Sequence, residues 1–318
     1  MDVELSVERD VERDVDRETW AAVMAAVKRA AKAVKRVGRK CVYGDWLIAA
    51  MYLWSVWHDR PLCWACERSS HYNTLFPPRR LPSVSQFTRR VKSDAVRRIL
   101  QRVHDELAAV SLATPLSCLD GKPLTVSPVS KDRDAARGHI TGGFAKGYKL
   151  HAWVTEDGRI PLWSVMPLNV AEQSVALALC ARLPADTMPG DALILADSNY
   201  DSAPLHKAIA ATTPARLLVP LRGQKQVGAG GHHEVTLRQM GAARRELLAL
   251  WEKHPKLAEH VLHFRNRVEG GFSALTSHGG GLASLPAWAR TLGRVRRWVG
   301  AKIIMYHARL RARKLVAA

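Results

Sequence analysis

The sequence predicts an α/β fold in which a mixed sheet flanked by helices follows an all-α region. Up to about residue 112 the chain carries only helical patterns. Beyond Thr114 and Pro115, short apolar runs alternate with turn signals. An early hairpin followed by strand–helix–strand units then indicates a mixed sheet rather than a purely parallel one.

The charge of the chain favours a polyanionic partner. Its 318 residues include 48 Lys and Arg against 29 Asp and Glu, a formal net charge of +19, and the isoelectric point is near 10.2. A pI above about 9 is typical of domains that bind nucleic acid. Double-stranded DNA is therefore the expected partner, and a merely soluble basic protein is the alternative.

The first 18 residues oppose this trend. They hold eight acids and three bases, a charge of −5, so the remainder carries +24. With few large apolar residues, residues 1–18 predict an acidic lead-in that is either a solvated helix or a flexible segment. A role in shielding the basic surface when DNA is absent is a further hypothesis.

Residues 19–112 predict a helical DNA-binding domain. An Ala-rich helix spans about 19–37, and Asp45 is a candidate cap for a second helix whose aromatic face suits a core. A short helix over about 61–69 precedes the break FPPRRLP.

A short basic helix after the break completes the outline of a helix-turn-helix, although any small helical bundle can produce that outline. Ser83 or Ser85 suits its N-cap. The side chains expected to contact DNA from this helix are Gln86, Arg89, Arg90 and Lys92.

Residues 113–285 predict the sheet. The expected order is the strand LSCLD, the hairpin YKLHAWVTEDGRIPLWSVMP, the helix AEQSVALALCARL, the strand DALILAD, the helix YDSAPLHKAIAA and the strand RLLVPL. A loop and helix insertion is expected around 222–258, beginning with an exposed Gly-rich stretch.

Residues 286–318 predict a basic, amphipathic C-terminal helix that either meets phosphates or forms a solvated face. Its arginines are Arg290, Arg294, Arg296, Arg297, Arg309, Arg311 and Arg313, of which Arg294 and Arg297 are the chief candidates for DNA contact. No apolar run reaches the roughly 18 residues of a membrane span. With five cysteines and no signal peptide, the chain is expected to be cytoplasmic with reduced thiols.

Three carboxylates indicate the chemistry. Asp120 and Asp197 each end a predicted strand, and Glu269 lies one helical turn after Arg265 on the same face. Open α/β sheets place their sites at the carboxyl ends of neighbouring strands. Each acid alone is more readily a turn or surface residue, but three converging carboxylates can hold two divalent cations for phosphodiester chemistry.

The stretches CLDGKPL, FAKGYKLHAWVTEDGRIP, LILADSNYDS and RNRVEGGF carry a resemblance. Over roughly residues 40–313 the chain resembles a bacterial insertion-sequence transposase of the DDE type, in the group whose glutamate lies in a Tyr-x2-Arg-x3-Glu-x6-Lys signature. The resemblance implies a ribonuclease-H-like domain with Asp120 on its first strand, Asp197 ending its fourth and Glu269 on a helix behind the sheet.

The resemblance also implies a reaction. Asp120, Asp197 and Glu269 would bind two Mg²⁺ or Mn²⁺ ions, with Arg265 as a further catalytic residue. The enzyme would act as a homodimer that cuts at the terminal inverted repeats of a bacterial mobile element and joins the 3′ ends to target DNA. The signature tyrosine and lysine fall on Leu262 and Thr276, so a hairpin intermediate stays an open question.

Near the carboxylates, Lys149 and His151 share one face of a strand and are expected to approach DNA, with an ordinary polar strand face as the alternative. Asn169 is expected to shape the active-site loop. Two other functions stay open: a transposase-derived DNA-binding protein without catalysis, and a nuclease of the same fold without strand transfer.

Overall fold

The chain divides into two units, which are treated separately. One comprises Met1–Ala109, Leu275–Ala289 and Arg297–Ala318, and the other comprises Val110–Ala274 and Arg290–Arg296. The structure is a computed structural model that describes residues 2–34, 41–71, 80–108, 114–183, 188, 190, 192–219, 241–276, 281–282 and 284–317, without the side chains of 2–11, 71, 248 and 266–271.

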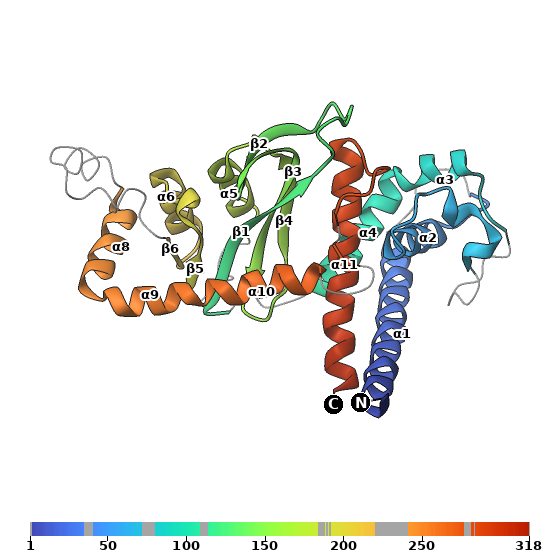
Figure 1. Cartoon of the computed structure of the whole chain (residues 1–318), viewed down its shortest axis with the longest axis horizontal. Helices are drawn as coiled ribbons and strands as arrows, with labels where there is room; N and C mark the ends of the chain where they lie inside the picture. Colours follow the sequence, from blue (N-terminus) through green and yellow to red (C-terminus); the bar gives the residue numbers. More distant parts are fainter. Residues whose placement is uncertain are drawn as a thin grey trace. The chain divides into compact units, whose positions relative to one another are not determined.

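The first unit is helical, as predicted (Figure 1). The acidic lead-in and the Ala-rich segment form a single helix, α1. The predicted short helix at 61–69 is instead two 3₁₀ turns, η1 and η2. The elements are α1 (Asp2–Ala33), α2 (Asp45–Trp57), η1 (Trp64–Cys66), η2 (Arg68–His71), α3 (Val84–Val91), α4 (Asp94–Ala108) and most of α11 (Leu292–Val316).

Most of the aromatic face of α2 belongs to the core, although Trp46 is 37% exposed. The ring centroids of Trp20 and Trp54 lie 4.8 Å apart, and those of Trp20 and Trp57 lie 5.9 Å apart, both in edge-to-face geometry. The prediction that Asp45 caps α2 is wrong, because Gly44 occupies the N-cap position. Asp45 instead accepts a hydrogen bond from Arg90 on α3 at 2.5 Å, with both side chains largely buried.

The prediction of an amphipathic C-terminal helix is wrong over residues 301–309, which are buried without a break. Arg309 is only 4% exposed there, and it donates hydrogen bonds to Glu12 and Asp16 of α1. Arg313 also lies 3.5 Å from Glu12. Arg309 is therefore paired inside the unit rather than presented to phosphates.

The second unit is built on a six-stranded mixed sheet, which confirms the predicted class. The strand order is β2-β3-β1-β5-β6, and β4 also pairs with β3. β1 runs antiparallel to β3 and parallel to β5. The sequence patterns missed β2. The strands are β1 (Leu116–Thr125), β2 (Ala136–Ile140), β3 (Gly143–Thr155), β4 (Leu162–Pro167), β5 (Leu193–Leu195) and β6 (Arg216–Leu218).

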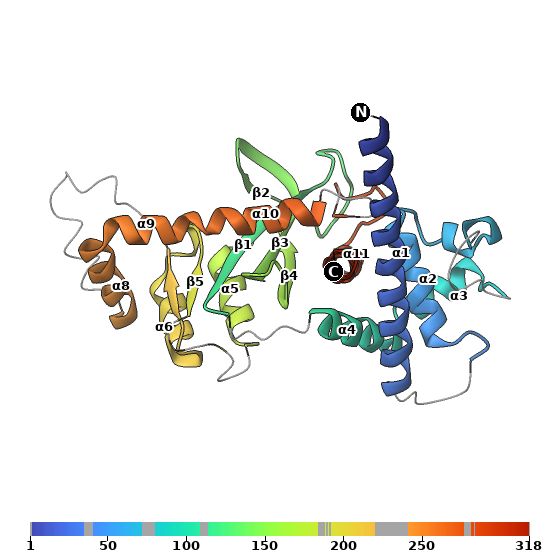
Figure 2. The same cartoon turned by 90° about the horizontal axis from the view of Figure 1, so that it is seen from below.

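Helices lie on both sides of this sheet. Figure 2 shows β3, β4 and β5 between α10 on one side and α5 and α6 on the other, with β2 beyond α10. The Gly-rich stretch at 222–234 lies outside the described residues. No helix in the described part of the chain is long and apolar enough to cross a bilayer. The helices are α5 (Glu172–Cys180), α6 (Ala203–Thr212), α8 (Ala242–Lys253), α9 (Pro255–His263) and α10 (Arg265–Thr276).

Close backbone approach fixes β3 beside β1. A Cβ atom added at Gly147 would lie 2.3 Å from the carbonyl oxygen of Leu124, well inside van der Waals contact. We therefore expect Gly147→Ala to lower the free energy of unfolding by about 1–3 kcal/mol, the usual cost of overpacking. Urea titration followed by circular dichroism measures this change.

Gly190→Ala is the matched control, because a Cβ at Gly190 meets no atom within 4 Å. We expect its unfolding curve to overlay that of the wild type. Equal stability of the two variants would contradict the close approach of the strands.

Candidate active site

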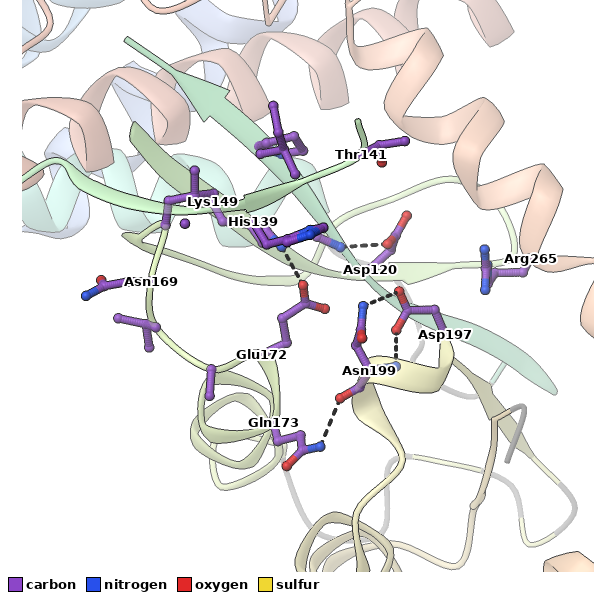
Figure 3. Close-up of a pocket in the computed structure, with 17 residues that line it drawn as sticks. Asp120, His139, Thr141, Lys149, Asn169, Glu172, Gln173, Asp197, Asn199 and Arg265 are labelled. Carbon is purple, nitrogen blue, oxygen red and sulfur yellow. Dashed lines mark hydrogen bonds and ion pairs between the residues drawn. The ribbon is translucent and has the colours of Figure 1, made fainter. Parts of the chain in front are cut away.

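A cavity of about 920 Å³ opens at the edge of the sheet in the second unit. Its walls come from β1, β2, β3, the loop after β4, α5, the turn after β5 and the start of α10. Figure 3 shows side chains from these separate elements facing the same space. The polar residues that line it include Asp120, Lys149, Asn169, Glu172, Gln173, Asp197, Asn199 and Arg265.

Strand register brings the first two predicted carboxylates together. Cys118 of β1 pairs with Leu195 of β5 in parallel. Asp120 lies two residues after Cys118 and Asp197 lies two residues after Leu195, so the two aspartates occupy equivalent positions beyond this pair. Both line the cavity. Asp197 follows its strand as predicted. Asp120 does not end a strand, because β1 continues to Thr125 through its antiparallel pairing with β3.

Asp197 also follows the fifth strand along the chain rather than the fourth that the resemblance implies. The additional strand is β2, which pairs with the beginning of β3 in antiparallel register. This difference in numbering leaves the neighbour relation between β1 and β5 unchanged.

Backbone amides orient both carboxylates. The amide of Gly121 donates to Oδ1 of Asp120 at 2.7 Å. The amide of Asn199 donates to Oδ1 of Asp197 at 2.7 Å, and Nδ2 of Asn199 lies 3.2 Å from Oδ2 of the same carboxylate. These hydrogen bonds limit the rotation of both side chains.

The third predicted carboxylate is located only by its helix. Glu269 lies in α10, which confirms the predicted helical segment, but its side chain is outside the described residues. Arg265 begins α10 and lines the cavity beside Asp197 (Figure 3). Leu262 belongs to the preceding helix α9, and Thr276 ends α10.

The cavity also contains a charged pair that the sequence patterns did not single out in full. Lys149 of β3 donates to Glu172 at the start of α5, and their side chains are only 14% and 16% exposed. Lys149 packs over β1, since a Cβ at Gly121 would lie 2.9 Å from its Cδ. An acid in the first turn of a helix commonly stabilises that helix, so the sequence offered no reason to place Glu172 in the cavity.

His151 does not reach the surface. The prediction that it approaches DNA with Lys149 is wrong for this structure, because His151 is 1% exposed. Among the described residues, neither of its ring nitrogens has a hydrogen-bond partner. Burial, with a smaller contribution from Lys149, lowers the pKa of His151 to about 4.

Tyr200 lies beneath the cavity and is 1% exposed. Burial, together with the carboxylates of Glu172, Asp120 and Asp197, raises its pKa well above the usual range. The tyrosine is therefore a neutral hydroxyl among these acids.

The predicted DNA contacts on α3 divide into two kinds. Arg89 and Lys92 are exposed. Gln86 forms a capping box with Ser83, and Arg90 forms the ion pair with Asp45 and also donates to the carbonyl of Tyr43 at 2.9 Å. The Arg90 side chain therefore binds Asp45 and Tyr43 within the helical unit rather than pointing to solvent.

The C-terminal arginines also differ from one another. Arg294 is exposed and Arg297 is half-buried. Arg296 donates to the carbonyl of Val165 at 3.0 Å, so it fastens the start of α11 to β4 within the second unit.

In the described part of the chain there is no group of three or more His, Cys, Asp or Glu residues arranged to hold a metal ion.

Comparison with known proteins gives the family. The family model "Transposase DDE domain" matches residues 112–306, which is more than half of the chain. The chain belongs to the DDE transposase family. Its mixed α/β fold, preceded by a helical region, agrees with the resemblance found in the sequence. DDE transposases act in DNA transposition and recombination.

Other comparisons add little to this DDE transposase. No curated protein matches its sequence. One solved structure, of a piggyBac transposase synaptic complex with hairpin DNA, is similar over 66% of this chain and 49% of that chain, with 12% identity and a TM-score of 0.34. The chain thus spans about half the length of that protein.

The buried His151 predicts a loss of stability in acid. Its pKa is about 4 when folded and about 6.5 when unfolded, so the unfolded transposase binds the additional proton as pH falls through this window. We expect the wild type to lose on the order of 3 kcal/mol between pH 6.5 and 4 from this residue. His151→Phe should remove that part of the loss in urea titrations across the pH range.

His139→Phe is the control, because His139 is exposed. Its stability should follow the wild type as pH is lowered. Parallel pH profiles for His151→Phe and the wild type would show that His151 does not stay neutral in the folded protein.

Proposed function

We propose that this DDE transposase cleaves DNA at the ends of an insertion sequence and joins the freed 3′ ends to target DNA. The observation that carries the proposal is the parallel register that sets Asp120 level with Asp197 in one cavity. Glu269 would supply the third carboxylate, since α10 begins at the cavity with Arg265 one turn earlier.

The donor set fits divalent cations such as Mg²⁺ or Mn²⁺. Carboxylate oxygens are the ligands these ions prefer, and Asp120 presents its oxygens from β1 while Asp197 presents its own from the turn after β5. Two bound ions would activate water and stabilise the leaving 3′ oxygen of the phosphodiester. Glu269 would complete the set from α10, whose first residue lines the same cavity.

Cationic side chains in the cavity have a separate task. Arg265, at the cavity wall, would bind non-bridging phosphate oxygens and stabilise charge that builds up during the reaction. Lys149, on the other wall of the cavity, would bind the phosphate backbone of the DNA strand. Its hydrogen bond to Glu172 holds the Lys149 ammonium group in place. Asn169 lines the same cavity on the loop before α5 and would shape the entrance.

The helical unit would bind the element ends. Arg89 on α3 and Lys92 directly after it are exposed cations, and Gln86 of the capping box lies on the same helix. Exposed Arg294 and half-buried Arg297 on α11 would add phosphate contacts. A homodimer would allow two such units to hold two ends of the same element.

Removal of either described carboxylate tests the catalytic part. We expect Asp120→Asn and Asp197→Asn to lower Mg²⁺-dependent cleavage of DNA that carries the element ends by at least about 100-fold, because each removes a charged metal ligand. Binding of the same DNA in gel-shift assays should change less than about threefold. Glu269→Gln should behave in the same way.

Asp157→Asn is the matched control, since Asp157 lies in the β3–β4 turn and pairs with Arg159 at 3.1 Å. It should cleave like the wild type. Full cleavage by Asp120→Asn would refute the proposed site, and cut ends that never join a target plasmid would reduce the function to a nuclease.

The DNA-binding part is tested through salt dependence. Each phosphate contact contributes a slope of about −0.9 to log K against log salt concentration. We expect Arg89→Ala combined with Lys92→Ala to make the slope shallower by about 1–2 and to weaken binding of element ends. Fluorescence anisotropy between low and physiological salt measures both quantities.

Lys28→Ala, which removes an exposed cation from α1, is the charge control. Its salt slope should match the wild type. An unchanged slope for the Arg89 and Lys92 variant would remove α3 from the DNA interface.

A further inference from the structure

A buried ion pair holds the loop that carries Asp197. Asp201, four residues after Asp197, has a side chain that is 0% exposed. Nη2 of Arg244, on α8, lies 2.5 Å from its Oδ2, and Nε2 of His206, on α6, lies 3.5 Å from its Oδ1. A carboxylate buried this deeply is stable only when it is paired with a cation, so the ion pair with Arg244 has a structural role.

A second contact holds the same loop from α5. Nε2 of Gln173 donates to the carbonyl of Asn199 at 3.0 Å and lies 3.4 Å from the carbonyl of Asp201. Helix α5 therefore holds the turn between Asp197 and Asp201 at its backbone, and α8 holds it at the Asp201 side chain (Figure 3 shows the α5 contact). His206 of α6 lies next to the same carboxylate.

The gripped turn is also the part that aims Asp197. The Asn199 amide and side chain both contact the Asp197 carboxylate, and the Asp201 amide donates to the carbonyl of Ser198 at 3.2 Å. A short path of bonded atoms thus runs from Arg244 through Asp201 and Asn199 to the carboxylate. Movement of Asp201 would change the direction of Asp197 because few backbone dihedrals separate them.

We infer that Asp201 and Arg244 are positioning residues for Asp197. Arg244 comes from α8, which follows β6 and precedes Glu269 along the chain, so the predicted insertion contributes an anchor to the site. The inference rests on the proposed function for its effect on metal binding. The anchoring of the loop is a property of the fold and can be measured separately.

Two readouts separate these levels. Hydrogen–deuterium exchange of residues 198–201 reports the order of the loop, and titration calorimetry with Mn²⁺ alone reports the carboxylate site. The variants are Asp201→Asn and Arg244→Met, with Arg244→Lys as the conservative replacement. Asp45→Asn is the matched control, since it breaks the largely buried Arg90–Asp45 ion pair in the helical unit.

For Asp201→Asn and Arg244→Met we expect exchange in the loop to accelerate and the Kd for Mn²⁺ to rise about 10-fold, the usual effect of losing a group that orients a metal ligand. Arg244→Lys should fall between these variants and the wild type. Asp45→Asn should lower the melting temperature without changing either readout.

Unchanged loop exchange and unchanged Mn²⁺ affinity in a folded Asp201→Asn protein would overturn the inference, even if its melting temperature fell as far as that of Asp45→Asn. Faster exchange with wild-type Mn²⁺ affinity would likewise overturn the positioning of Asp197. If the wild type bound no Mn²⁺, the proposed metal chemistry would fail, whereas faster exchange in Asp201→Asn would still establish the anchor.

Discussion

The parallel pairing of β1 with β5 is the contact on which the proposed site depends. Only three residues of each strand take part, yet their register sets Asp120 beside Asp197. β3 holds β1 from its other side over nine residue pairs, so β1 cannot slip by one position without turning its side chains to the opposite face. The sheet thus sets the level of the two carboxylates, and the turn after β5 adds the contacts that orient Asp197.

Buried ion pairs connect this sheet with its helices. Lys149 and Glu172 join β3 to α5, and Asp201 and Arg244 join the turn after β5 to α8. Each pair is mostly shielded from water, so loss of one partner leaves a charge that is costly to bury. These contacts act on geometry more than on overall stability, because a well-packed apolar pair would stabilise the fold equally well.

Some of the cationic side chains of this strongly basic chain form ion pairs inside the helical unit, and others are exposed to solvent. Arg309 is buried against Glu12 and Asp16, and Arg90 is paired with Asp45. These arginines organise the helical unit. Arg89, Lys92 and Arg294 are among the exposed cations, and we propose them for phosphate contact. Net charge thus indicates the class of partner but not the residues that meet it.

The sequence by itself determined the fold class, the hairpin, both aspartates and the family, because apolar periodicity and short motifs are local properties. The sequence patterns did not predict β2 or the place of Glu172 in the cavity. They also predicted an amphipathic helix where residues 301–309 are buried, and an accessible His151 where the side chain is buried. Only the tertiary structure decided these points, since burial and ion pairing depend on which distant segments meet. A polar residue has the same letter in a turn, a cavity or a core, and its neighbours in space decide its role.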